Sequence, residues 1–81
     1  MPTILRLKDS LRVVIYPNDH DPAHVHVIGA EKEARFILNC QGGDPELMGN
    51  YKFSSSEINK IKTELSKEIY FLCKKWREIH G

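Results

Sequence analysis

The last third of the chain carries one apolar stripe, and this stripe limits the folds open to a chain of 81 residues. Its members recur three or four residues apart, which is the period of an amphipathic helix. They are Ile58, Ile61, Leu65, Ile69, Leu72, Trp76 and Ile79. A helix of about 26 residues would be roughly 39 Å long. We therefore predict one long C-terminal helix whose apolar face needs a second layer to cover it.

The start of this helix is marked by two signals. Ser54 is followed three residues later by Glu57, which fits a capping box. Phe53 precedes the predicted cap and Ile58 occupies the fourth helical position, as in a hydrophobic staple. We therefore expect the helix to begin directly after Ser54.

The residues before the helix have the pattern of short strands separated by turns. Alternating polarity and enrichment in β-branched and aromatic residues predict strands over residues 3–7, 11–16, 24–28 and 34–38, with a short fifth strand at 46–48 as an option. Residues 29–33 are expected to form a hairpin loop. A helix across an antiparallel sheet is the simplest two-layer arrangement. We predict a single α+β domain over residues 1–81, with a small antiparallel sheet of four to five strands packed against one long helix.

Three of the four histidines lie between Tyr16 and Val27, and this stretch is the only dense chemical cluster in the sequence. Residues 17–23 have the composition of a turn. From His24 onward polar and apolar residues alternate, so His24 and His26 are expected on one face of a strand, with at least one of them accessible to solvent. A loop of about seven residues is longer than the usual hairpin connection. Such extra length more often serves function than structure.

Two chemical interpretations of this stretch remain open. In the first, His24 and His26 bind a divalent metal ion such as zinc, with His20 or Asp19 as a third ligand. In the second, His20, His24 and His26 act as general acid and base in a nuclease or other hydrolase. A cation for phosphate would then come from a nearby arginine, and Arg35 is one candidate.

A third interpretation is structural, combined with a protein-binding surface. The histidines would donate hydrogen bonds to loop carbonyl groups and brace the long hairpin, because buried polar groups usually find such partners. Asn18 and Asp19 would cap the loop. The candidate binding residues are Tyr16, Asn18, Asp19 and Arg35.

Composition narrows the partners and the compartment. Twelve basic and eleven acidic residues leave the chain nearly neutral, so RNA binding is only weakly supported. Cys40 and Cys73 are too few for a disulfide framework; Cys73 suits a packed helix position and Cys40 a loop. No apolar run approaches the roughly 20 residues of a membrane span. The first residues lack the pattern of a signal peptide. A reducing cytoplasm and no membrane association are the expectations.

The chain resembles a family of small bacterial proteins catalogued as domain of unknown function 4160. The resemblance covers nearly the whole chain and is most specific in the histidine stretch. The matching segments are residues 1–6, 16–27 and 34–36, Phe53 with Ser54, Glu57, and residues 76–81. The sequence departs from the family pattern at Pro17, Ala23 and Lys52, none of which is a histidine.

The resemblance implies a function only in outline. Family members are often encoded beside a second small protein, in pairs that resemble toxin–antitoxin modules. The expected function is that of a small cytoplasmic protein that binds a partner encoded nearby, with homodimer formation as a further option. The alternative is a nuclease or other hydrolase that uses the loop with His20, His24 and His26, with or without a metal.

Overall fold

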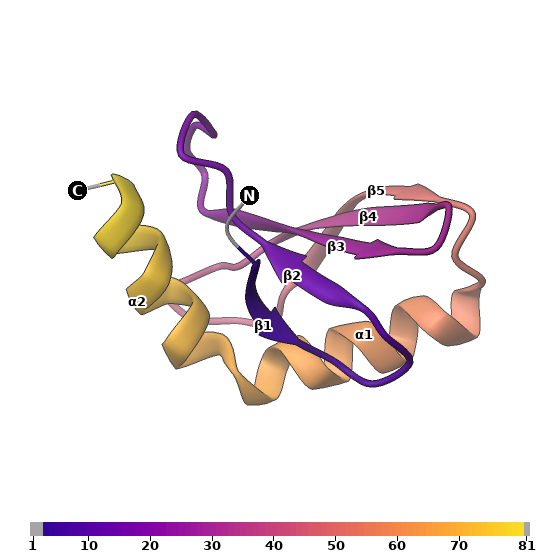
Figure 1. Ribbon diagram of the computed structural model, residues 1–81. Coiled ribbons are helices and arrows are strands. Elements are labelled where there is room, and N and C mark those ends of the chain that lie inside the picture. The colour runs from indigo at the N-terminus through magenta and orange to yellow at the C-terminus, as the bar shows by residue number, and fades with distance from the viewer. Residues whose placement is uncertain (1–2, 81) are drawn as a thin grey trace.

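The protein is a five-stranded antiparallel sheet with two helices, as a computed structural model shows for residues 3–80 (Figure 1). Met1, Pro2 and Gly81 lie outside the described residues. The elements are β1 (Thr3–Arg6), β2 (Arg12–Val14), β3 (His24–Gly29), β4 (Lys32–Ile37), β5 (Glu46–Tyr51), α1 (Ser55–Lys67) and α2 (Ile69–His80). The predicted α+β class is confirmed, and the optional fifth strand is present.

The strands lie in the sheet in the order in which they occur along the chain, each antiparallel to the next. The register aligns Val13 with Val27 and Val27 with Ala34, and these three side chains are buried. On the opposite face, His26 pairs with Arg35. One face of the sheet therefore meets the helices, and the other carries the histidines.

The connection between β2 and β3 spans residues 15–23, which we call the β2–β3 loop. It is longer than predicted because β2 ends at Val14 and does not continue to Tyr16. The hairpin between β3 and β4 is correspondingly shorter than predicted, since β3 extends to Gly29 and β4 starts at Lys32.

The expectation of one long C-terminal helix is wrong, because the helix is interrupted at Glu68. This residue leaves the helical conformation, with φ −109° and ψ 14°, and its N–H donates to the Leu65 carbonyl at 3.0 Å. A new helix follows, in which the Leu72 N–H donates to the Glu68 carbonyl at 2.9 Å. Figure 1 shows α1 running along the sheet and α2 turning toward the end that carries the β2–β3 loop.

The predicted start of the helix is confirmed. The Glu57 N–H donates to Ser54 Oγ at 3.1 Å, and the Ser54 N–H donates to Glu57 Oε1 at 2.8 Å. Phe53 is buried, and Ile58 is partly buried against the same core. These two reciprocal bonds satisfy backbone N–H groups that have no partner within the helix.

The core lies between the helix-facing side of the sheet and the apolar faces of both helices. Phe36 and Leu38 are fully buried from the sheet side, and Leu65 and Leu72 are fully buried from the helices. Trp76 is 6% exposed. The stripe read from the sequence therefore lies against the core, although it spans two helices and omits the buried Cys73.

Cys40 and Cys73 form a disulfide, with their Cα atoms 5.8 Å apart. The sequence predicts a packed Cys73 on the helix and Cys40 in a loop, but it does not predict their pairing. The connection after β4 returns Cys40 to α2, where the packed Cys73 can meet it. Neither helix within residues 3–80 is long and apolar enough to cross a membrane.

Candidate functional site

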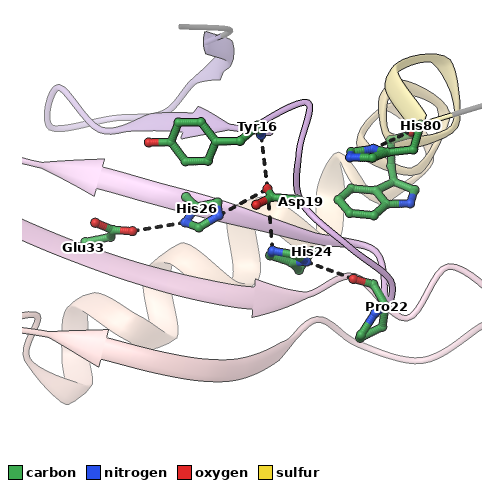
Figure 2. A network of polar contacts seen from close by, with 8 residues as sticks. Tyr16, Asp19, Pro22, His24, His26, Glu33 and His80 are labelled. Carbon is green, nitrogen blue, oxygen red and sulfur yellow. Dashed lines mark hydrogen bonds and ion pairs between the residues drawn. The ribbon is translucent and has the colours of Figure 1, made fainter.

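The β2–β3 loop places Asp19 above the face of β3 that carries His24 and His26 (Figure 2). The Asp19 N–H donates to the Tyr16 carbonyl at 3.0 Å, and the Tyr16 N–H donates to Asp19 Oδ2 at 3.1 Å. Such turns, in which an aspartate side chain accepts from nearby backbone, are a local preference of Asp. The carboxylate is therefore held in place by its own turn.

One carboxylate oxygen meets both histidines. Asp19 Oδ2 lies 3.6 Å from His24 Nε2 and 3.3 Å from His26 Nε2. The two imidazole centroids are 5.4 Å apart. This convergence follows from strand geometry, since residues two apart point to the same face. We call Asp19, His24 and His26 the Asp–His–His cluster.

The second nitrogen of each ring has an acceptor partner. His24 Nδ1 lies 2.9 Å from the Pro22 carbonyl oxygen, and His26 Nδ1 lies 3.1 Å from Glu33 Oε2 (Figure 2). A carbonyl or carboxylate oxygen accepts hydrogen bonds, so Nδ1 must carry a proton in each ring for these contacts to be hydrogen bonds. Each Nε2 faces Asp19 Oδ2, and it presents a lone pair in the neutral ring or a second N–H in the protonated ring.

The cluster is largely enclosed. The exposed fractions of the side chains are 16% for Asp19, 11% for His24 and 12% for His26. Both histidine side chains are therefore mostly buried, which contradicts the expectation that at least one of them is accessible to solvent. Aromatic rings lie against the two histidines. The ring centroids of Tyr16 and His26 are 4.7 Å apart in an edge-to-face arrangement, and those of Trp76 and His24 are 5.3 Å apart.

His80 is the last residue of α2 and lies beside Trp76. Its ring stacks on Trp76 with the centroids 3.8 Å apart, and its Nδ1 lies 3.2 Å from the Trp76 carbonyl oxygen. The C-terminal end of α2 is thereby fixed beside the cluster, where Figure 2 shows it.

The other sequence candidates do not join the cluster. The metal-compatible group within the described chain consists of Asp19, His24 and His26, and His20 is not part of it. His20 and Asn18 are exposed in the loop. Arg35 is exposed beside His26 on β4, and its guanidinium lies over Gly49, where a Cβ atom would approach Nη2 to 2.8 Å.

Sequence reasoning missed Glu33 as a partner of the cluster. The sequence predicts a hairpin loop over residues 29–33, whereas Glu33 belongs to β4 and its carboxylate lies 3.1 Å from His26 Nδ1. A shorter turn would have revealed it, because the pairing of His26 with Arg35 places Glu33 two residues along the same face. The roles of the Pro22 carbonyl and of Trp76 depend on tertiary structure and left no signal in the sequence.

The family model described as "Domain of unknown function (DUF4160)" matches residues 11–77. The chain belongs to the DUF4160 family. The match includes the whole Asp–His–His cluster and Glu33, so the site lies within the part of the chain that defines membership of DUF4160. No curated protein and no solved structure matches the chain.

Proposed function

We propose that this DUF4160 protein binds a second small protein through the exposed edge of β5, as one member of a pair of the toxin–antitoxin type. One observation carries the proposal: an edge strand bears three large, exposed apolar residues. The exposed fractions are 42% for Leu47, 42% for Met48 and 60% for Tyr51. Exposed apolar residues gathered on one strand are typical of interaction surfaces.

The geometry of β5 supports addition of a further strand. β5 has six residues and pairs with β4 on one side only, as the last strand of the sheet formed by residues 3–80. The other edge strand, β1, has four residues. Natural proteins usually protect long edge strands, because their free N–H and C=O groups pair readily with another chain. β5 is therefore the edge better suited to a partner.

A register irregularity lies in the middle of this edge. Leu47 pairs with Phe36 and Gly49 pairs with Arg35, so Met48 is an extra residue between them. The regular ladder is locally disrupted at such a bulge. Leu47 and Met48 are both exposed there, which leaves their side chains available to a partner.

The partner that fits this edge is an extended segment with apolar residues between charged ends. Glu46 begins β5 and Lys52 follows it, so the edge is acidic at one end and basic at the other. A partner strand with a basic residue beside Glu46 and an acidic residue beside Lys52 would complement it. Recognition by strand addition combines main-chain hydrogen bonds with side-chain contacts of this kind.

A second copy in antiparallel orientation has the same complementary ends, so the experiment must distinguish the two. We would capture binding partners from the native host with the wild-type protein and score both protein and RNA. The captured protein would then be purified and titrated calorimetrically against the wild type and a Leu47→Glu, Met48→Glu variant. Sedimentation of the isolated wild type would show whether it self-associates.

We expect the β5 variant to lose at least tenfold in affinity for the purified partner. Tyr70→Glu is the matched control, because Tyr70 is 80% exposed on α2 and lies outside β5. Unchanged affinity in the β5 variant, or an equal loss in the Tyr70 variant, would contradict the proposal. Concentration-dependent dimerisation abolished by the β5 substitutions, without any partner, would replace it with a homodimer.

The pairing of toxin and antitoxin has its own test. If the proposal is right, expression of one of the two proteins alone arrests growth of the host and co-expression restores it. If this protein is the antitoxin, its β5 variant should fail to restore growth. If it is the toxin, its β5 variant should still arrest growth when the partner is co-expressed. The Tyr70 variant should behave as wild type in both cases. Growth that is unaffected by either protein alone would contradict this part of the proposal.

A second candidate function is hydrolysis of a phosphodiester by the Asp–His–His cluster, favoured by the convergence of two histidines on one carboxylate. Proton transfer by paired imidazoles is a common basis of such chemistry. The enclosure of both rings at 11–12% exposure limits access by a polymer. Cleavage of RNA that is lost in His26→Gln and retained in His20→Gln would support this function.

A further inference from the structure

We propose that Asp19, His24 and His26 bind one divalent metal ion of the zinc class. This site is separate from the β5 edge, so either proposal can fail without the other. The ligand atoms are Asp19 Oδ2, His24 Nε2 and His26 Nε2, and the donor atoms of the three residues lie within 4.8 Å of one another.

The spacing of these atoms fits a tetrahedral ion. Zinc binds histidine nitrogen and carboxylate oxygen at about 2.0–2.2 Å, which puts neighbouring tetrahedral ligands roughly 3.3–3.6 Å apart. The separations from Asp19 Oδ2 are 3.3 Å to His26 Nε2 and 3.6 Å to His24 Nε2. Two edges of the ligand triangle therefore already have the length that an ion would impose.

An unpartnered nitrogen marks the position of the ion. His26 Nε2 is buried and has no hydrogen-bond partner among the described residues, although Asp19 Oδ2 lies 3.3 Å away. A buried polar atom without a partner is unfavourable, because it has lost its hydrogen bonds to water. A metal ion beside Asp19 would remove this penalty, because Nε2 presents a lone pair to it.

Every ligand is also held by an outer hydrogen bond. Metal-binding histidines usually donate their other N–H to a carbonyl or carboxylate group. His24 does so to Pro22, His26 does so to Glu33, and the Tyr16 N–H fixes the Asp19 carboxylate. The cluster therefore shows the outer contacts of a metal site as well as its ligand atoms.

The ligand set also restricts the type of metal. Magnesium and calcium prefer six or more oxygen ligands. Two imidazoles and one carboxylate instead suit zinc and neighbouring divalent transition metals. Three protein ligands leave a fourth tetrahedral position for water or another small ligand.

A competing arrangement is an ion pair without metal. In that case His26 would carry protons on both nitrogens and bridge Asp19 and Glu33, which lie 3.3 Å and 3.1 Å from it. The two arrangements differ at one atom, since His26 Nε2 is either a metal ligand or a proton donor. Nitrogen NMR of the ring distinguishes these states directly.

The first experiment is a calorimetric titration of the chelator-treated full chain with zinc chloride. No thiol reductant is added, so that Cys40 and Cys73 stay paired and cannot bind zinc as thiolates. We expect the titration to give one zinc ion per chain. In NMR spectra recorded along the same titration, the ring signals of His24 and His26 should change in parallel. Cobalt should give the visible absorption of a tetrahedral site, while magnesium should cause no change.

The variants Asp19→Asn, His24→Gln and His26→Gln should each weaken zinc binding by at least tenfold. Glu33→Gln should weaken it by about 10- to 100-fold, because a neutral amide oxygen replaces the charged carboxylate that accepts the outer hydrogen bond. His20→Gln is the matched control, because His20 lies in the same loop but outside the cluster. Glu33 tests the site even if a ligand variant fails to fold, since its side chain is 48% exposed.

Zinc binding at one ion per chain that depends on the three ligands and not on His20 would establish the site. Absence of stoichiometric binding, or equal affinity in His26→Gln and wild type, would overturn it. A doubly protonated His26 ring that persists at excess zinc would also overturn it in favour of the ion pair.

Discussion

Ser54 is a single residue whose contribution to stability can be measured cleanly. Its hydroxyl accepts the Glu57 N–H at 3.1 Å and caps α1. Ser54→Ala should lower the free energy of unfolding by about 1 kcal/mol, within a range of about 0.5–2 kcal/mol for such caps. Urea denaturation would measure the change. Ser55→Ala, one residue further on and also exposed, should change stability by much less.

Glu57 should make stability depend on pH at the acidic end. An ion pair with Lys32 at 2.8 Å and the Ser54 N–H lower the pKa of Glu57 from 4.5 to about 2. A carboxylate with a lowered pKa stabilises the folded state above its ordinary pKa, and this contribution disappears as the pH falls toward the lowered value. Unfolding at a series of pH values should therefore show a loss between about pH 4.5 and 2.

The matched comparison for this prediction is Glu57→Gln, which should be less stable than wild type at pH 7 and should lose less stability on acidification. The difference in unfolding free energy between the two proteins should shrink as the pH approaches about 2. Glu31→Gln, at an exposed turn, should follow the wild type. Parallel curves for wild type and Glu57→Gln would show that the ion pair has no effect.

For single residues, the sequence predicts the chemistry of the site better than it predicts which residues belong to the site. Alternation along β3 correctly predicts that His24 and His26 share a face, and Asp19 is correctly placed near them. The sequence does not show that His20 lies outside the cluster, because the direction of its side chain depends on the conformation of the loop. It does not show that Glu33 contacts the cluster either, because that contact depends on the register of the β3–β4 hairpin.

Among the elements, α2 depends most on one side chain. Trp76 is 6% exposed and contacts both His24 and His80. Trp76→Ala should lower the free energy of unfolding by about 3–5 kcal/mol, as for other large aromatic residues removed from a core. Tyr70→Ala is the control on the same helix, since Tyr70 is 80% exposed. A folded Trp76→Ala protein with unchanged stability would contradict this packing role.

The existence of the strands and helices was largely predictable, but the break between α1 and α2 was not. Leu65 and Ile69 keep a spacing of four residues across Glu68, so the periodicity continues through the interruption. No glycine or proline marks the position. The break depends on where the two helices pack, and α2 is also tied to Cys40 by the disulfide. Such tertiary effects override local sequence preference.

For the whole molecule, the Cys40–Cys73 disulfide closes a loop with a sequence separation of 33. Loop-closure entropy predicts that a cross-link of this length stabilises the folded state by about 3–4 kcal/mol. Reduction should therefore lower the urea midpoint of the wild type substantially. The variant Cys40→Ser should unfold near the reduced wild type and should not respond to reductant. Equal midpoints for the oxidised and reduced wild type would contradict the prediction.

The disulfide also bears on the compartment of the protein. Cytosolic thiols are usually kept reduced in cells of moderate growth temperature. Cytoplasmic location, expected from the sequence, stays a prediction, and alkylation of thiols in intact host cells would show whether Cys40 and Cys73 are paired there.

The order of the strands has a consequence for synthesis of the chain. Every strand pairs with its neighbour in sequence, so the whole sheet can assemble from local contacts. The helices that cover its apolar face follow the sheet along the chain, at residues 55–80. Until they emerge from the ribosome, Val25, Val27 and Phe36 have nothing to shield them from water. We therefore expect the nascent sheet to be prone to aggregation until α1 and α2 cover its apolar face.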